Sequence, residues 1–295
     1  MPHLTWCLSG PLTSLPIHAA GLYGVKDQPK IFDYVVSSFT PSLAALLGTQ
    51  PHPRERSHPV RLLTVSQPAT PGQSRLPGTV HEIDVIGAIQ GETNRFHLTR
   101  LNDQAATVTA VLEHMKECGW IHLACHGVQD SVNPTNSAFL LFDAPLTLKE
   151  IMKQSFSHTE LAFLSGCRTA VGDSELPGEA IHFAAGMLNA GYGSVVGTMW
   201  SIGDDDAPIV AERFYKYLTE EAGGDSGRAA YALHHAVAQL REIRGENNIA
   251  RWAPFIHLGT CSPSLPERYG STQVGVAKED ASGMYLNSLF LVVHY

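Results

Sequence analysis

The sequence lacks several patterns that each mark a common class of protein. It has no run rich in Lys and Arg, and 28 acidic residues outnumber 20 basic ones, which gives a net charge of −8. Nucleic-acid binding is therefore disfavoured, because it needs a basic patch facing the phosphates. The longest apolar stretch, Leu286–Val293, is far too short to span a bilayer. We predict neither a nucleic-acid nor a membrane partner.

Disulfide and export signals are also missing. The five cysteines (Cys7, Cys118, Cys125, Cys167 and Cys261) are odd in number and widely spaced, and they form no Cys-x-x-Cys pair. No glycosylation sequon remains once the proline-containing Asn133-Pro134-Thr135 is set aside. The N-terminus lacks the basic and apolar regions of a signal peptide. These features favour a reducing, cytoplasmic location.

Strands and helices alternate along most of the chain. Strands are predicted over Val60–Ser66, Arg95–Leu101, Trp120–Cys125, Ala138–Phe142, Leu161–Ser165, Ser194–Trp200 and Trp252–Leu258. Helices are predicted near Val80–Gln90, from a cap at Asn102 or Asp103 through Met115, over Leu148–Lys153, from about Ile181 to Ala190, and over Ala207–Glu221 and Gly227–Ile243. This alternation predicts an α/β fold with a mostly parallel sheet covered on both faces.

The stretch His122-Leu-Ala-Cys-His-Gly127 contains the residue types of a metal site. On a strand, however, His122 and His126 share one face while Cys125 points to the other. No His-Glu-x-x-His or paired Cys-x-x-Cys motif supports a metal, and the absence of Gly-x-Ser-x-Gly disfavours a serine hydrolase of that type. We therefore predict no metal and no cofactor.

Two predicted strands end in similar ways, one at His126-Gly127 and the other at Gly166-Cys167. Reactive groups gather beyond the carboxyl ends of parallel strands, so His126 and Cys167 are candidates for an acid/base and a thiol nucleophile. Gly127 and Gly166 leave backbone N–H groups accessible to a developing oxyanion. Spacing alone slightly favours the structural alternative, a buried cysteine and a hydrogen-bonded histidine.

A longer set of motifs, in order along the chain, resembles the CHAT domain family. The resemblance covers roughly residues 4 to 260. Its motifs are Leu15–Gly21, Ser37–Ser42, Ile121–Gly127, Asn136-Ser137, Leu140–Asp143, Leu146–Leu148, Leu164–Thr169, Gly178–Ile181, Leu188–Gly191, Ser194–Trp200, Asp204, Phe214-Tyr215 and Trp252–Phe255.

This resemblance implies a caspase-like three-layer α/β sandwich and hydrolysis of peptide bonds without a metal. Carried over to this sequence, Cys167 is the nucleophile and His126 the general acid/base. The backbone N–H groups of Gly127 and Cys167 form the oxyanion hole. Family members are often joined to TPR arrays, and several act in regulated proteolysis or cell-death-like responses. The implied partners are a protein or peptide substrate and a regulatory or TPR-containing protein.

Acidic residues after the predicted strand Ser194–Trp200 are candidates for substrate binding. Asp204 and Asp206 resemble the separase stretch that helps to bind a P1 arginine, and Asp173 follows the nucleophile. For any one of the aspartates before Pro208, a helix-capping role is the favoured alternative. Ser137 and Glu179 are interpreted as structural supports of the site.

The expected organisation is one domain over residues 1–269 and a tail over 270–295. The tail is an added strand, a partner-docking segment or an unusual chain end. A catalytically silent module for protein interactions is the alternative to a peptidase. The intact His126 and Cys167 argue against it.

Overall fold

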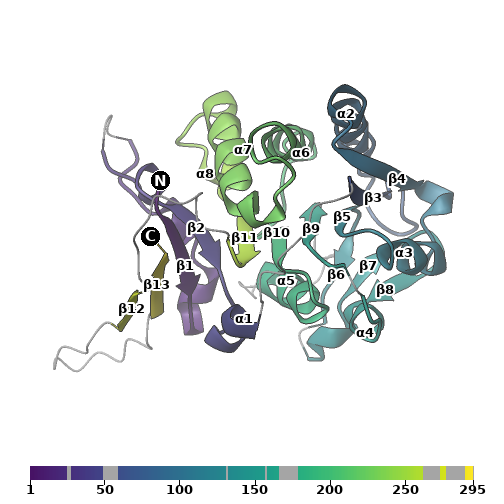
Figure 1. Cartoon of the computed structure of the whole chain (residues 1–295), viewed down its shortest axis with the longest axis horizontal. Coiled ribbons are helices and arrows are strands. Elements are labelled where there is room, and N and C mark those ends of the chain that lie inside the picture. Colours follow the sequence, from purple (N-terminus) through teal and green to yellow (C-terminus); the bar gives the residue numbers. More distant parts are fainter. Residues whose placement is uncertain are drawn as a thin grey trace.

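The computed structural model describes residues 1–24, 28–48, 59–130, 132–156, 158–165, 179–261, 273–276 and 290–294. Its strands form one large sheet and one small antiparallel sheet (Figure 1). In spatial order, the large sheet contains β12 (Gln273–Val276), β13 (Phe290–His294), β1 (His3–Cys7), β2 (Val36–Phe39), β11 (Phe255–Gly259), β10 (Ser194–Thr198), β9 (Leu161–Ser165), β5 (Trp120–Ala124), β3 (Val60–Ser66) and β4 (Phe96–Asn102). The small sheet contains β6 (Gly127–Val128), β7 (Ala138–Leu140) and β8 (Pro145–Thr147).

The large sheet is mostly parallel. Neighbouring strands run parallel from β4 through β3, β5 and β9 to β10, and again between β11 and β2 and between β2 and β1. The pairs β10–β11, β1–β13 and β12–β13 are antiparallel. Every residue of β5, β9 and β10 is buried. Such apolar runs are typical of parallel strands with both faces covered.

Helices cover both faces of the large sheet (Figure 1). The helices are α1 (Leu43–Gly48), α2 (Gly78–Thr93), α3 (Val108–Met115), α4 (Leu148–Met152), α5 (Glu179–Asn189), α6 (Ala207–Lys216), α7 (Ala229–Arg244) and α8 (Ile249–Trp252). One apolar core lies between the sheet and α2, α6 and α7, and a second lies between the sheet and α3, α4 and α5. The predicted three-layer α/β sandwich is confirmed. Within the described ranges, no helix has both the length and the apolar character to cross a bilayer.

The predicted cap of α3 is wrong. Thr107 caps this helix, and its Oγ1 accepts a hydrogen bond from the N–H of Ala110 at 3.2 Å. Asp103 instead begins a short 3-10 turn in a left-handed conformation, with φ of 49°. The chain therefore makes a separate turn after β4, with Asn102 at the N-cap position of that turn, and enters the helix only after Thr107.

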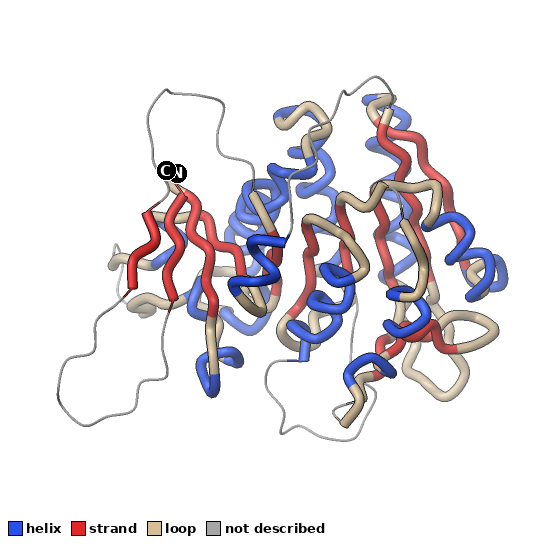
Figure 2. Tube along the Cα trace, turned by 60° about the horizontal axis from the view of Figure 1, so that its bottom comes forward, coloured by secondary structure: helices blue, strands red, loops and turns tan. Residues whose placement is uncertain are grey.

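The tail adds strands to the large sheet. β13 pairs antiparallel with β1 along its full length, with His3 opposite His294. The two ends of the chain consequently lie side by side (Figure 2). Of the roles left open for the tail, the structure shows an added strand.

The parallel strands β3, β5 and β9 end at one edge of the large sheet. Their last residues are in register, with Ser66 beside Ala124 and Ala124 beside Ser165. Three segments begin at this edge. One connects β3 to α2, and one follows β5 with Cys125 and His126. The third connects β10, which runs parallel to β9, to α6. The topology thus brings together the sequence motifs singled out above.

Candidate active site

His126 lies two residues beyond the end of β5 and is almost completely buried, with 1% of its surface exposed. Its Nε2 lies 2.7 Å from the backbone oxygen of Ser74. Because a carbonyl oxygen can only accept, Nε2 must carry the proton in this contact. The neutral imidazole then has its lone pair on Nδ1. Nδ1 is buried and has no hydrogen-bond partner among the described residues.

Ser74 belongs to the segment between β3 and α2, which folds back over the strand ends. Backbone hydrogen bonds join Gln67 to Ala124 at 3.0 Å and Leu76 to Pro68 at 2.9 Å. The side chain of Gln67 also donates to the backbone oxygen of Asp103 at 2.8 Å. The sequence predicts only a polar, proline-rich surface loop here. A backbone carbonyl has no signature in a sequence, so the role of Ser74 was not predictable.

Gly127 follows His126 directly and begins β6, at the edge of the small sheet. It pairs with Phe139 on β7, and the neighbouring Leu140 N–H donates to the oxygen of His126 at 2.8 Å. This is the pattern of a non-hydrogen-bonded antiparallel pair. The N–H of Gly127 therefore points away from β7, toward the open edge of the small sheet.

Gly166, Cys167 and Asp173 lie outside the described residues. Ser165, the last residue of β9, lies beside Ala124 of β5. His126 and Cys167 each follow two residues after this matched pair. Adjacent strands are about 4.8 Å apart, so the described ends of β5 and β9 lie side by side.

His122 lies in the core and not at the strand end. It is fully buried, and its ring stacks on Phe163 at 4.7 Å. Cys125 is also buried, in the core on the opposite face of the sheet. Among the described residues, no cluster of three His, Cys, Asp or Glu side chains is arranged to hold a metal ion.

The three aspartates before α6 lie in different surroundings. Asp204 is exposed and accepts a hydrogen bond from the N–H of Gly78 at 2.8 Å, so it binds the start of α2. With Pro77, His81 and Glu212 it lines an open hollow of about 590 Å³. Asp206 is fully buried.

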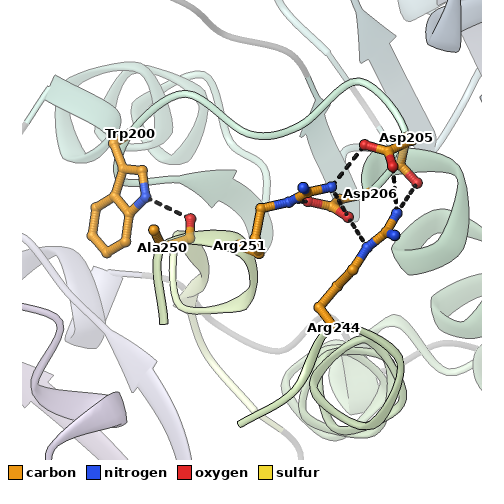
Figure 3. A network of polar contacts seen from close by, with 6 residues as sticks. All are labelled: Trp200, Asp205, Asp206, Arg244, Ala250 and Arg251. Atoms are coloured by element: carbon orange, nitrogen blue, oxygen red, sulfur yellow. Dashed lines mark hydrogen bonds and ion pairs between the residues drawn. The ribbon is translucent and has the colours of Figure 1, made fainter. Parts of the chain in front are cut away.

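Arg244 and Arg251 bind the carboxylate of Asp206 (Figure 3). Arg244 Nε donates to Oδ1 at 2.7 Å, and Arg251 donates to both oxygens. Asp206 stands at the N-cap position of α6, but its side chain makes no capping hydrogen bond. Neither Asp204 nor Asp206 therefore caps α6, since one carboxylate is bonded to α2 and the other to the two arginines.

Ser137 supports the segment that follows β6. It is fully buried, and its Oγ accepts a hydrogen bond from the N–H of Asp130 at 3.1 Å. Its backbone oxygen accepts from Leu148 at 2.8 Å, at the start of α4. Glu179 is the first residue of α5. The Ser137 contacts thus connect the small sheet to α4.

Residues 1–260 match the family model of the CHAT domain. The chain belongs to the CHAT family. Separase of Saccharomyces cerevisiae, solved in complex with securin, is similar in structure, with a TM-score of 0.51 and 15% sequence identity. The likeness covers 78% of this chain but only 14% of the separase chain. At this identity it shows the fold alone.

The Arg-specific cysteine proteinase gingipain R of Porphyromonas gingivalis has a TM-score of 0.49 and 12% identity, over 82% of this CHAT chain and 58% of the proteinase. No curated protein sequence matches the chain. The family and the separase likeness together give this CHAT protein a caspase-like peptidase fold.

Proposed function

We propose that this CHAT protein is a cysteine endopeptidase with His126 as general acid/base and Cys167 as nucleophile. The observation that carries the proposal is the hydrogen bond from His126 Nε2 to the Ser74 carbonyl. It fixes the ring and leaves a buried Nδ1 lone pair with no partner among the described residues. A structural histidine is usually satisfied at both nitrogens, whereas a general base needs one of them available.

The proposed reaction begins when His126 Nδ1 takes the thiol proton of Cys167. The thiolate attacks the peptide carbonyl, and the resulting imidazolium returns the proton to the leaving amine as the C–N bond breaks. Water, deprotonated by the same imidazole, then hydrolyses the acyl-enzyme and releases Cys167. The Ser74 carbonyl accepts from Nε2–H throughout, so it stabilises the imidazolium and holds the ring in place.

The oxyanion of the tetrahedral intermediate needs N–H donors that are not already used. Gly127 N–H points away from β7, which supports its proposed role beside the N–H of Cys167. Removal of one such donor typically lowers kcat by about 100- to 1000-fold. A proline at position 127 would remove this N–H.

For the substrate, we propose Asp204 as the residue that favours a basic P1 side chain. It is exposed and lines the 590 Å³ hollow between the first turns of α2 and α6. Asp206 is less suited, because two arginines already bind its carboxylate. Asp173 remains a candidate by its place in the sequence. The proposed substrates are proteins or peptides, and a regulatory or TPR-containing partner remains part of the proposal.

The nucleophile is tested by labelling with an electrophilic peptide that carries Arg at P1. Wild-type protein should be labelled, Cys167→Ala should not, and Cys7→Ala should behave like the wild type. Cys7 is a suitable control because burial raises the pKa of its thiol. Labelling that persists in Cys167→Ala would show that another residue is the nucleophile. Absence of labelling and cleavage in the wild type, together with tight binding of a partner, would support the silent interaction module.

The substrate preference is tested with peptide libraries that vary P1. Asp204→Asn should lower cleavage after Arg and Lys relative to cleavage after Leu. Asp84→Asn, an exposed aspartate of α2 paired with Arg100, should leave the preference unchanged. An unaltered preference in Asp204→Asn would remove this residue from the substrate pocket.

A further inference from the structure

A buried carboxylate lies beneath the candidate site, on α2. Glu82 is 1% exposed, and its Oε2 accepts a hydrogen bond from Ser165 Oγ at 2.9 Å. Its Oε1 lies 3.0 Å from His122 Nε2, within ion-pair distance but not aligned as a hydrogen bond. His122 Nδ1 in turn lies 3.2 Å from the hydroxyl of Tyr215. We call these four residues the Glu82 network.

The packing of α2 does not itself require a carboxylate at this position. The other buried side chains of this helix are Thr79 in its first turn, which accepts a hydrogen bond from Ser66, and Ile83, Ile86 and Ile89, which pack into the apolar core. A buried carboxylate is costly unless its partners compensate, and an apolar residue of similar volume is often as stable. What Glu82 provides, and an aliphatic side chain cannot, is a bond to Ser165 and a charge beside His122.

The network holds together the two strands that lead to the proposed catalytic residues. Ser165 is the last residue of β9, two positions before Cys167. His122 lies on β5, four positions before His126. Glu82 therefore contacts one side chain of each strand from a third element, close to the edge where both strands end.

Tyr215 contacts the other ring nitrogen of His122. Burial, and next the negative charge of Glu82, raise the pKa of Tyr215 well above its usual value, so the phenol keeps its proton. Its hydroxyl can donate to or accept from His122 Nδ1, depending on the tautomer of the ring. Ser165 donates to Glu82 Oε2 with either tautomer. The network therefore links buried side chains of α2, α6, β5 and β9 around one carboxylate.

We propose that Glu82 is a positioning residue for the candidate active site, which fixes the described ends of β5 and β9, the strands that precede His126 and Cys167 in the chain. This inference rests on the proposed function, because it takes these two residues as the reacting pair. A misplacement of 1 Å can cost a catalytic centre roughly 100-fold in rate.

Alkylation of Cys167 by iodoacetamide, followed by peptide mass spectrometry across pH 5 to 9, tests the proposal on the full chain. Proximity to the imidazole should place the midpoint of the wild-type profile below the ordinary thiol pKa of about 8.5. Ser165→Ala and Glu82→Leu should raise the midpoint toward that value. Glu82→Gln keeps an oxygen that can accept from Ser165, so its midpoint should not rise.

The direction in which the alkylation midpoint moves distinguishes a positioning role of Glu82 from a simple effect of its charge. Removal of a nearby negative charge would by itself stabilise the thiolate and lower the midpoint. Ile86→Ala is the matched control, because it destabilises the same helix from the same core and removes no polar group that could bond to the network. Its midpoint should not move at a temperature where every variant is folded by circular dichroism.

Two results would overturn the proposal. One is an unchanged or lowered midpoint in both Ser165→Ala and Glu82→Leu, and the other is an equal rise in Ile86→Ala. A failure of the proposed function would give another result. The alkylation profile would still depend on Glu82, but neither an electrophilic peptide nor any substrate peptide would react with the wild-type protein.

Discussion

Two adjacent aspartates contact the same two arginines, and replacing each in turn tests how burial controls the strength of an ion pair. Asp206 is fully buried, whereas the side chain of Asp205 is 67% exposed. Asp205 nevertheless accepts from Arg244 at 2.6 Å and from Arg251 at 2.7 Å (Figure 3). The two carboxylates thus share both partners, with three bonds to Asp206 and two to Asp205, and they differ strongly in solvent access.

Removal of one partner from a buried ion pair costs about 3–5 kcal/mol, because the remaining charge stays without compensation. Arg244 and Arg251 are 24% and 32% exposed, so water can reach them partly. We therefore expect Asp206→Ala to lower the free energy of unfolding by an amount near the low end, about 3 kcal/mol. For Asp205→Ala we expect about 0–1 kcal/mol, because water already solvates that carboxylate.

Urea unfolding followed by circular dichroism measures both losses. With an m-value of about 3 kcal/mol per molar, the Asp206→Ala midpoint should fall by about 1 M and that of Asp205→Ala by less than about 0.3 M. Sodium chloride at 1 M, where the Debye length is about 3 Å, should remove most of the Asp205 effect and little of the Asp206 effect. Equal losses in the two variants would refute the argument from burial.

Two other predictions use the same unfolding measurement. Gly78→Ala should destabilise the protein by about 1–3 kcal/mol, because an added Cβ would lie 2.1 Å from the backbone oxygen of Asp204. Gly91→Ala in the same helix meets nothing within 4 Å and should instead stabilise it by up to about 1 kcal/mol; the reverse order would refute the packing argument. His257 joins Ser38 and Ser194 through bonds of 2.6 Å, and burial, with the charge of His3 next, lowers its pKa to about 3. Below about pH 6.5 the His257 imidazole binds a proton in the unfolded protein but stays neutral in the folded one. Its contribution to stability is therefore present above that pH and is lost as the pH falls toward 3. His257→Gln should reduce the slope of unfolding free energy between pH 6 and 4 by about 1.4 kcal/mol per pH unit, and an unchanged slope would show that His257 is protonated in the folded state.

Much of the fold could be predicted from local patterns. The strands Val60–Ser66 and Leu161–Ser165 match their predicted limits, because short runs rich in apolar residues between turn residues favour strands. The cap of α3 was mispredicted, since Asp103 and Thr107 both suit a cap and only the turn between them decides which one serves. Likewise, no pattern in the tail from residue 270 indicates which strand it pairs with, because its pairing with β1 joins opposite ends of the chain.

The sequence by itself determined the alternation of strands and helices and the candidates His126 and Cys167, because residue type and spacing are local properties. Only the tertiary structure revealed the Ser74 carbonyl behind His126 and the Glu82 carboxylate beneath both strands. It also separated Asp204, which is exposed and bonded to α2, from Asp206, which is enclosed by two arginines. These roles depend on which distant segments meet at the strand ends. The burial of a side chain and its bonding partners depend on these contacts between distant segments, so they cannot be read from the sequence around a single residue.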